Sequence, residues 1–186
     1  MKKRWYDIKA SAGGKPAVLD INEDIGMWGI SAAELVRDLK SCSGQLNVNI
    51  NSLGGSVTEG IAVYNALRFY ANTEGNSVVM TVTGVAASIA SIILMAGTKI
   101  RMPANTFIMV HKPWGGVAGN ADEMRDYADL LDKMESSLVG TYMARTGKSD
   151  ADIRAMLSED TWMTAEEAVA AGFADDGGVL CIWAVD

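Results

Sequence analysis

Histidine, cysteine, basic clusters and long apolar runs are all scarce in this sequence. Its 186 residues include one histidine, two cysteines and three prolines, and the formal net charge is -7. Nucleic acids and anionic membrane surfaces bind clustered Lys and Arg, and the only such cluster is "MKKR" at the start. No apolar stretch reaches the roughly 18 to 20 residues of a membrane-spanning helix. We therefore expect no nucleic-acid partner, no membrane partner and a cytoplasmic location.

Metal and cofactor motifs are also missing. Cys42 and Cys181 lie far apart and form no CxxC pattern, and they have a single histidine with which to share a metal. They therefore predict neither a disulfide framework nor a zinc site, but free thiols. The sequence contains no GxGxxG, GxxxxGK[ST] or HExxH motif, so it gives no support to a dinucleotide, nucleotide or zinc site. We expect no metal and no cofactor.

The composition fits one compact domain, because 49% of the residues are hydrophobic and 21% are charged. No repeat or proline-rich linker divides the chain, so we expect a single domain over residues 1–186. Strand-like segments alternate with helix-like segments, which predicts parallel strands joined by crossover helices in an α/β architecture. The expected strands are 15–21, 45–52, 77–84 and 106–111, and the expected helices between them are 31–40, 57–71 and 88–97.

Several helix ends and helix faces can be predicted as well. Ser31, followed three residues later by Glu34, predicts a capping box at the start of the first helix. Ser149 and Thr164 predict the N-caps of two later helices, and Gly172 predicts the end of the second of these. The helix over 57–71 is expected to pack on the sheet through apolar residues that include Ile61, Val63, Leu67 and Phe69.

Residues 120–145 predict a long helix, with acidic residues early and Arg145 late, as the helix dipole favours. Its apolar stripe could lie on its own domain or project and pack against another subunit. The pattern alone does not choose between these alternatives. The stripe consists of Met124, Tyr127, Leu130, Leu131, Met134, Leu138 and Tyr142.

His111 ends the apolar segment "TFIMV" and precedes the turn-forming "KPWGG". A lone histidine is more often structural than catalytic. However, strand ends in α/β proteins are where binding and catalytic groups collect. An imidazole is also the best general base that this chain offers to a serine hydroxyl. His111 is therefore a candidate catalytic base.

Ser88 follows the small residues "GVAA", which predict a tight turn from a strand into a helix. A hydroxyl at a helix N-terminus lies near free N–H groups that can stabilise a developing oxyanion. Ser88 is therefore either a nucleophile or simply an N-cap. Ser91 lies within the first turn and can bond to a preceding carbonyl, so the pattern prefers Ser88 as the candidate nucleophile.

The loop "NSLGGS" contains two adjacent glycines, Gly54 and Gly55. Glycines let the backbone approach a ligand without interference from a Cβ atom. The loop is equally consistent with an oxyanion or peptide-binding role and with a plain tight turn. The GxSxG elbow of many serine hydrolases is absent.

In this order, the segments resemble the Clp-type proteolytic subunit (ClpP) family of serine peptidases over about residues 45–176. The resemblance implies a ClpP/crotonase-like α/β fold of repeated β-β-α units with a protruding handle helix, the handle region covering about 113–146. It rests on the blocks "INSLGGSVTEGIAVYNAL", "GVAASIASIILMAGTK", "PANTFIMVHKPWGG" and "EDTWMTAEEAVAAGFAD".

The resemblance implies a role for individual residues. Ser88 would be the nucleophile, His111 the general base and Asp160 the carboxylate that accepts the second ring N–H of the histidine. The backbone N–H groups of Gly55 and Ile89 would form the oxyanion hole. Ser91 matches no functional position of the family. An extended substrate would bind by strand addition along Gly54, Gly55, Pro113, Trp114, Gly115 and Gly116.

The resemblance also implies a homo-oligomeric ring, with active sites facing an inner chamber and the long helix contacting a facing ring. Three features depart from the housekeeping members. Leu53 stands where they usually carry proline, and Glu159 stands where many carry an arginine that pairs across the ring interface. The amino-terminal part lacks the axial-loop segment that engages an ATP-driven unfoldase, which argues against an ATPase partner.

The segments "WYDIKA" and "EDIGMWGISAAELVRDL" look more like those of the Clp-related head maturation (prohead) proteases of tailed bacteriophages, which cleave capsid and scaffold proteins. We therefore expect an ATP-independent serine endopeptidase of capsid or scaffold proteins, in the bacterial or phage-infected cytoplasm or within the prohead. The alternatives are a housekeeping Clp subunit that works with a separate unfoldase and a catalytically silent ring or scaffold subunit. A crotonase-type acyl-CoA enzyme would share the fold, but it does not explain serine, histidine and aspartate in family order.

Overall fold

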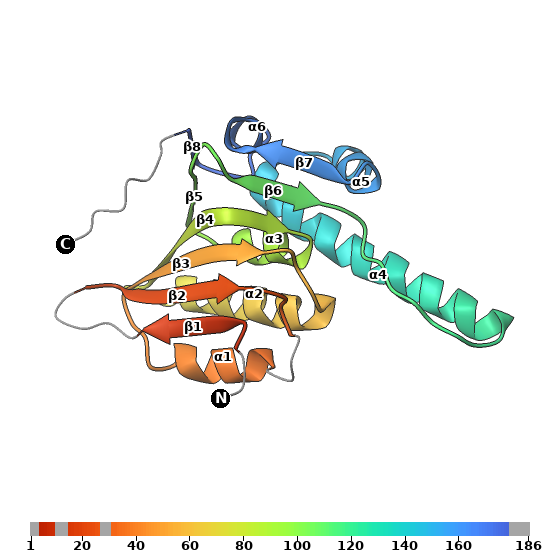
Figure 1. The fold of residues 1–186 in the computed structure, drawn as a ribbon, viewed down its shortest axis with the longest axis horizontal. Coiled ribbons are helices and arrows are strands. Elements are labelled where there is room, and N and C mark those ends of the chain that lie inside the picture. Colours follow the sequence, from red (N-terminus) through yellow and green to blue (C-terminus); the bar gives the residue numbers. More distant parts are fainter. Residues whose placement is uncertain (1–3, 10–14, 27–30, 179–186) are drawn as a thin grey trace.

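The computed structural model describes residues 4–9, 15–26 and 31–178 of the chain. These residues form one eight-stranded mixed sheet with helices packed against it (Figure 1), which confirms the predicted α/β class. The elements are β1 (Tyr6–Lys9), β2 (Ala17–Asn22), α1 (Ala32–Leu39), β3 (Gln45–Ser52), α2 (Val57–Ala71), β4 (Ser77–Ala87), α3 (Ile89–Leu94), β5 (Lys99–Met102), β6 (Phe107–Val110), α4 (Ala121–Thr146), α5 (Asp150–Ser158), β7 (Thr161–Thr164), α6 (Ala165–Ala170) and β8 (Asp176–Gly177).

The centre of the sheet is parallel, as the alternation of strands and helices predicts. β2, β3 and β4 lie side by side, and both β5 and β6 pair with β4 in parallel at different points along its length. β1 and β7 are antiparallel additions to β2 and β6, and β8 pairs with β5. The sequence did not predict β1, β5, β7 or β8, because strands of two to four residues carry too little periodicity to recognise.

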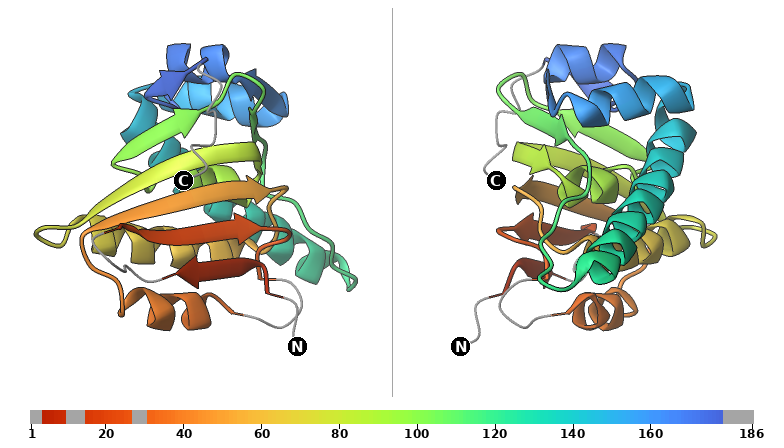
Figure 2. Two further views of the ribbon diagram at one scale, coloured as in Figure 1. Left: turned by 60° about the vertical axis from the view of Figure 1, so that its left-hand side comes forward. Right: turned by 90° about the vertical axis from the view of Figure 1, so that its right-hand side faces the viewer.

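Alternation along the strands gives the sheet one apolar face. In β3, Leu46, Val48 and Ile50 are buried, whereas Asn47 and Asn49 between them stay partly exposed. The side chains of a strand point alternately to the two faces, so the buried set lies on one face. α2 and α3 pack against that face, with α1 beside α2 (Figure 2).

The capping box predicted for α1 does not form. Ser31 has the extended backbone of an N-cap, but its side chain makes no capping hydrogen bond. The Glu34 N–H donates to the backbone carbonyl of Ser31 instead, and the Glu34 carboxylate pairs with Arg4 at 3.5 Å. The N–H of Ala32 donates to the carboxylate of Glu59 on α2. A tertiary contact has therefore replaced the local cap.

The other predicted helix ends are present. Ser149 accepts a hydrogen bond from the Asp152 N–H at the start of α5, and Thr164 forms a capping box at the start of α6. Gly172, with φ 84°, follows the end of α6. The predicted buried face of α2 is confirmed at Val63 and Leu67 but wrong at Phe69, which is 77% exposed, because the helix buries Tyr70 beside them.

The strand before Ser88 is longer than predicted. β4 continues to Ala87, so residues 84–87 are extended and form no tight turn. Pairing with β6 keeps them extended, since Val85, Ala86 and Ala87 lie beside Phe107, Ile108 and Met109. α3 then begins at Ile89, directly after Ser88.

The long helix α4 begins with a capping box at Asn120 and ends at Gly147, whose φ is 70°. Its C-terminal half packs on the core through Leu138, Val139 and Tyr142. Its N-terminal half extends beyond the sheet (Figures 1 and 2), and Met124 and Leu130 there are 50% and 43% exposed. The apolar stripe therefore combines the two alternatives: its N-terminal part projects beyond the sheet, whereas Leu138 and Tyr142 lie against the chain's own core.

Candidate active site

Three strands end at the same edge of the sheet, and a predicted functional segment follows each of them. β3, β4 and β6 run parallel, so their carboxyl ends lie close together. Gly54 and Gly55 follow β3, Ser88 follows β4 and His111 follows β6. The fold therefore brings together segments that are far apart in the sequence.

Ser88 and His111 are joined by a hydrogen bond. The distance between Ser88 Oγ and His111 Nε2 is 2.7 Å. The Ser88 N–H donates to the Met109 carbonyl at 2.9 Å, which ties the end of β4 to β6 just before the histidine. The Ser88 side chain makes no capping bond to α3, so its interpretation as a simple N-cap is wrong. In this geometry the imidazole can take the hydroxyl proton as the oxygen attacks a carbonyl carbon.

The backbone of Ser88 is strained. Its φ of 54° and ψ of -129° lie in a region that residues other than glycine rarely adopt. Such a conformation costs on the order of 1–3 kcal/mol and persists only where the surrounding structure enforces it. Here the pairing of β4 with β6 on one side and the start of α3 on the other hold the residue in place.

Ser91 has a structural role in this site. Its Oγ donates to the Ser88 carbonyl at 2.5 Å and lies 2.7 Å from the hydroxyl of Tyr142 on α4. This confirms the prediction that Ser91 bonds to a preceding carbonyl. Burial raises the pKa of Tyr142 well above its ordinary value, so its hydroxyl stays protonated and can donate to Ser91. Ser91 thus links α3 to the base of the long helix.

Asp160 lies directly before β7, and His111 lies directly after the neighbouring strand β6. β6 and β7 are antiparallel and pair Val110 with Thr161. Because the two strands are antiparallel, His111, which follows Val110, and Asp160, which precedes Thr161 with φ 50°, lie at the same end of the strand pair. The Asp160 side chain is exposed and makes no hydrogen bond or ion pair with another described residue. The backbone therefore brings the two residues to the same end of paired strands, while their side chains are not hydrogen-bonded.

The backbone N–H groups of Gly55 and Ile89 lack partners in the part of the chain that the structure describes. The bridge between Ile25 and Gly55 uses the N–H groups of Ile25 and Ser56, which leaves that of Gly55 unused. Ile89 is the first residue of α3, so its N–H has no acceptor within the helix. Gly55 has a φ of 138°, and a Cβ there would overlap the Ile25 carbonyl. Free N–H groups beside a serine are the donors that an oxyanion hole requires.

A cleft of about 530 Å³ opens beside Ser88 and His111. Of the residues predicted to bind substrate, Gly55, Pro113 and Trp114 line it, and Trp114 is 79% exposed. The other lining residues were not predicted from the sequence, because single apolar residues and one carboxylate among 23 acidic residues give no distinct pattern. They are Asp24, Leu53, Val57 and Met109.

The remaining predicted substrate-binding residues do not line this cleft. Gly54 is buried, with φ 114°, and a Cβ on it would lie 2.6 Å from Ser88 Cβ, so it makes room for the serine. Gly115 packs against the hydroxyl of Tyr127 on α4. Gly116 is exposed, with no atom within 4 Å of a Cβ placed there.

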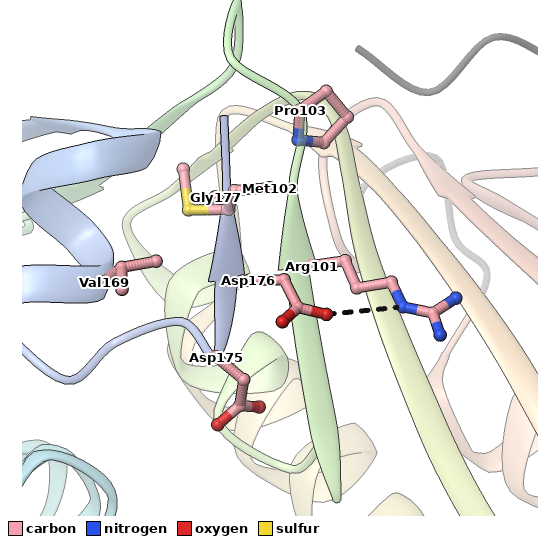
Figure 3. A pocket seen from close by; sticks show the side chains of 7 residues that line it. All are labelled: Arg101, Met102, Pro103, Val169, Asp175, Asp176 and Gly177. Carbon is pink, nitrogen blue, oxygen red and sulfur yellow. Dashed lines mark ion pairs between the residues drawn. The ribbon is translucent and has the colours of Figure 1, made fainter. Parts of the chain in front are cut away.

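A second hollow, of about 630 Å³, lies between β5, β8 and α6 (Figure 3). Its charged side chains pair with one another or with neighbours, as Arg101 Nε does with Asp176 at 4.0 Å. None of its lining residues is a serine, cysteine or histidine. Size therefore does not identify the active site, whereas the paired serine and histidine do.

The sequence also predicted no metal site, no membrane partner and free thiols, and the described residues bear on each of these expectations. In residues 4–9, 15–26 and 31–178, no group of three or more His, Cys, Asp or Glu side chains could hold a metal ion. No helix in the same residues is long and apolar enough to cross a bilayer. Cys42 is a half-buried free thiol, and burial raises its pKa. Cys181 lies outside the described residues.

A hydrogen-bonded serine and histidine at the carboxyl ends of parallel strands, beside free backbone N–H groups, form the kind of site that serine hydrolases use. Comparison with known proteins identifies the family. The family model described as Clp protease matches residues 29–178. The chain belongs to the Clp protease family, whose proteolytic subunits are serine peptidases, and it is therefore a hydrolase.

Three relatives illustrate the similarity. The ATP-dependent Clp protease proteolytic subunit 1 of Leifsonia xyli subsp. xyli is 34% identical over 148 residues, which cover 78% of this chain and 73% of that protein. The proteolytic subunit 2 of Tropheryma whipplei is 36% identical over 129 residues, covering 68% and 69%. The proteolytic subunit 2 of Thermobifida fusca is 35% identical over 150 residues, covering 79% and 68%. The family predicted from the sequence is thus confirmed.

Proposed function

We propose that this chain is a serine endopeptidase in which Ser88 attacks the peptide carbonyl and His111 acts as general base. The hydrogen bond of 2.7 Å between Ser88 Oγ and His111 Nε2 carries the proposal. As Ser88 Oγ bonds to the carbonyl carbon, His111 Nε2 takes its proton, and the N–H groups of Gly55 and Ile89 stabilise the oxyanion. The imidazolium then protonates the leaving amine, and an acyl-enzyme forms on Ser88. Water, activated by His111, hydrolyses the ester and frees the serine.

Asp160 would orient the histidine. When Ser88 donates to Nε2, the ring proton must reside on Nδ1, and a carboxylate that accepts this Nδ1–H fixes the tautomer and stabilises the imidazolium. The pairing of Val110 with Thr161 supports this role, because Asp160 precedes Thr161 and His111 follows Val110 at the same end of the strand pair. The exposed Asp160 side chain has no competing partner among the described residues, so it is free to turn toward the ring.

An extended substrate would bind along the Gly54–Gly55 loop and the segment from Pro113 to Gly116. Residues 113–118 belong to no helix or strand, and their backbone groups make no hydrogen bond with other described residues, so they are available for strand addition. Substrate side chains would then meet the mostly apolar walls of the cleft.

We also propose that the single domain over 1–186 assembles into a homo-oligomeric ring. The handle region, about 113–146, would contact a facing ring through the projecting half of α4. The exposure of Met124 and Leu130 supports this arrangement, since apolar side chains on a projecting helix gain stability when a partner covers them. Light scattering during size-exclusion chromatography would measure the assembly, and Leu130→Glu should reduce its mass.

Two biological roles are proposed for the peptidase. The likeness of "WYDIKA" and "EDIGMWGISAAELVRDL" to head maturation proteases favours ATP-independent cleavage of capsid or scaffold proteins. A housekeeping role with an ATP-driven unfoldase is supported about as well, because the three relatives described above are named as subunits of ATP-dependent proteases. Incubation with casein or capsid protein without any ATPase distinguishes them. Cleavage only after addition of an unfoldase and ATP would favour the second role.

Labelling with a fluorophosphonate, read by mass spectrometry, tests the peptidase itself. We expect an adduct on Ser88 in the assembled wild-type protein, and a peptide chloromethyl ketone should modify His111. Ser88→Ala should lose the fluorophosphonate adduct, whereas Ser91→Ala should keep it. An assembled wild-type protein modified at neither residue would overturn the proposal and favour the catalytically silent subunit.

A further inference from the structure

Asp24 lines the same cleft as Ser88 and His111. Its side chain is exposed, and it makes no hydrogen bond or ion pair with another described residue. Among the described residues that line the cleft, Asp24 is the only one with a carboxylate and His111 the only one with an imidazole. The cleft therefore contains one carboxylate that the proposed mechanism does not use.

The backbone on both sides of Asp24 is fixed. On one side, the Ser52 hydroxyl donates to the Glu23 carbonyl at 2.5 Å, and Ser52 is only 2% exposed. On the other side, the Ile25 N–H donates to the Gly54 carbonyl at 2.7 Å, and the Ile25 carbonyl accepts the Ser56 N–H at 2.9 Å. These bonds attach the Asp24 segment to the glycine loop beside the nucleophile.

Glu23 adopts a left-handed conformation with φ 66°. A residue other than glycine in this region is uncommon, and the surrounding hydrogen bonds must enforce it. The Ser52 hydroxyl bonded to its carbonyl supplies such a constraint. The carboxylate of Asp24 is thus attached to a backbone that is held in position before any ligand binds, which lowers the entropic cost of binding.

Most of the other residues that line the cleft are apolar. Leu53, Val57 and Trp114 line the cleft, and Leu53 and Trp114 are 66% and 79% exposed. An apolar wall suits the methylene stem of a long side chain, and an indole ring also attracts a cation to its face. Lys112, which follows His111 in sequence, pairs with Glu135 at 3.7 Å. Asp24 is thus left without an internal cationic partner among the described residues.

A lysine or arginine side chain combines the two properties that this cleft requires. Its stem would contact Leu53, Val57 and Trp114, and its charged end would pair with Asp24. The net charge of -7 on the chain also favours the approach of basic segments. A free α-amino group would satisfy the carboxylate but has no stem to cover the apolar walls.

We propose that Asp24 is a specificity-determining residue, which makes the peptidase prefer peptides with lysine or arginine next to the bond that is cleaved. The inference rests on the proposed function, because it assumes that Ser88 cleaves peptides in this cleft. It adds a substrate class, basic peptides, to that function.

Internally quenched peptides test the preference. The peptides differ at one residue near the scissile bond, which is lysine, norleucine or glutamate in turn, at each flanking position. Norleucine keeps the apolar stem without the charge. At one of these positions, we expect kcat/KM of the wild type to be about fivefold higher for lysine than for norleucine, the ratio that a partly exposed ion pair of about 1 kcal/mol produces. This ratio should fall with added salt.

Substitutions of Asp24 test whether this residue causes the preference for lysine. Asp24→Asn should reduce the lysine to norleucine ratio to about one, Asp24→Lys should favour glutamate, and Asp24→Glu should retain a lysine preference. Glu74→Gln removes a charge from an exposed residue outside the cleft and should leave the ratio as in the wild type. Equal rates for lysine and norleucine at every position in the wild type, or an unchanged ratio in Asp24→Asn, would overturn the inference.

Labelling separates this failure from failure of the proposed function. A fluorophosphonate adduct on wild-type Ser88, together with equal cleavage rates for the lysine and norleucine peptides, would overturn only the role of Asp24. Absence of both the adduct and any cleavage would overturn the peptidase function, and the Asp24 inference with it. Should Asp24→Lys not fold, Asp24→Asn and the salt dependence of the wild type still decide the question.

Discussion

Gly60 on α2 lies against Ile89 at the start of α3, so closely that a Cβ on Gly60 would overlap the Ile89 side chain. Both residues are buried. Ile89 follows the proposed nucleophile, and its N–H is a proposed oxyanion donor. The contact between the two helices therefore helps to fix the position of the site.

Gly60→Ala should disturb both stability and catalysis. The added methyl group must displace Ile89 or α2, and overpacking of this kind costs about 1–3 kcal/mol. We expect a lower free energy of unfolding in urea and slower acylation of Ser88 by a fluorophosphonate. Gly140→Ala is the matched control, because no atom lies within 4 Å of a Cβ at Gly140 in the described chain. It should be neutral or raise stability by up to about 1 kcal/mol. Equal behaviour of the two variants would contradict this account.

The two serines should respond differently to alanine. Ser88→Ala removes the hydroxyl that bonds to His111 and should abolish peptide cleavage while the protein still assembles. Ser91→Ala should retain cleavage but lower the unfolding free energy by about 1–3 kcal/mol, because it leaves the buried Tyr142 hydroxyl without its partner. Peptide hydrolysis and urea unfolding measure the two effects. Loss of cleavage in a folded, assembled Ser91→Ala protein would argue against the assignment.

Asp160→Asn tests the proposed orienting carboxylate. The amide should lower kcat by roughly 10²- to 10⁴-fold, because it favours the wrong histidine tautomer and does not stabilise the imidazolium. KM should change little, since Asp160 is not among the residues that line the cleft. Glu159→Gln is the control at the adjacent exposed carboxylate and should keep kcat close to that of the wild type. A wild-type kcat in Asp160→Asn would assign the carboxylate to another residue.

Tyr6 makes stability dependent on alkaline pH. Burial and a hydrogen bond of 2.9 Å from its hydroxyl to Asp38 raise the pKa of Tyr6 from 10.0 to about 12. Because the folded protein holds this proton more tightly, the contribution is complete below pH 10 and is lost as pH rises toward about 12. We expect the difference in unfolding free energy between the wild type and Tyr6→Phe to shrink over this range. A constant difference would contradict the assignment.

The central strands, and the edge of the sheet where the site lies, could be predicted because each pattern lies within one continuous segment of the sequence. The alternation in 45–52 and the apolar segment before His111 identified β3 and β6. The buried face of α2 was predicted only in part, because apolar residues occur on most sides of that helix. Phe69 was wrongly expected to pack inward. The side of α2 that packs on the sheet depends on the chain topology, which the periodicity of the sequence does not encode.

The residues of the site were harder to predict from the sequence than the fold. Pattern indicated Ser88 and His111, but only family resemblance selected Asp160, which the unpredicted strand β7 brings to the same end of the β6–β7 pair as His111. Asp24 lies at the cleft because hydrogen bonds attach its neighbours Glu23 and Ile25 to Ser52 and to the glycine loop. These are tertiary contacts between segments that are far apart in the sequence. The left-handed backbone of Glu23 and Ser88 also gave no signal, since neither residue is glycine.

The positive φ of Ser88 sets a limit on selection for heat resistance. A glycine at position 88 would adopt the same backbone without steric penalty, so Ser88→Gly should melt at a higher temperature than the wild type although it has no nucleophile. A library screened for thermal tolerance alone would therefore accumulate inactive protein at this position. Directed evolution of a robust enzyme from this chain has to assay turnover in every round.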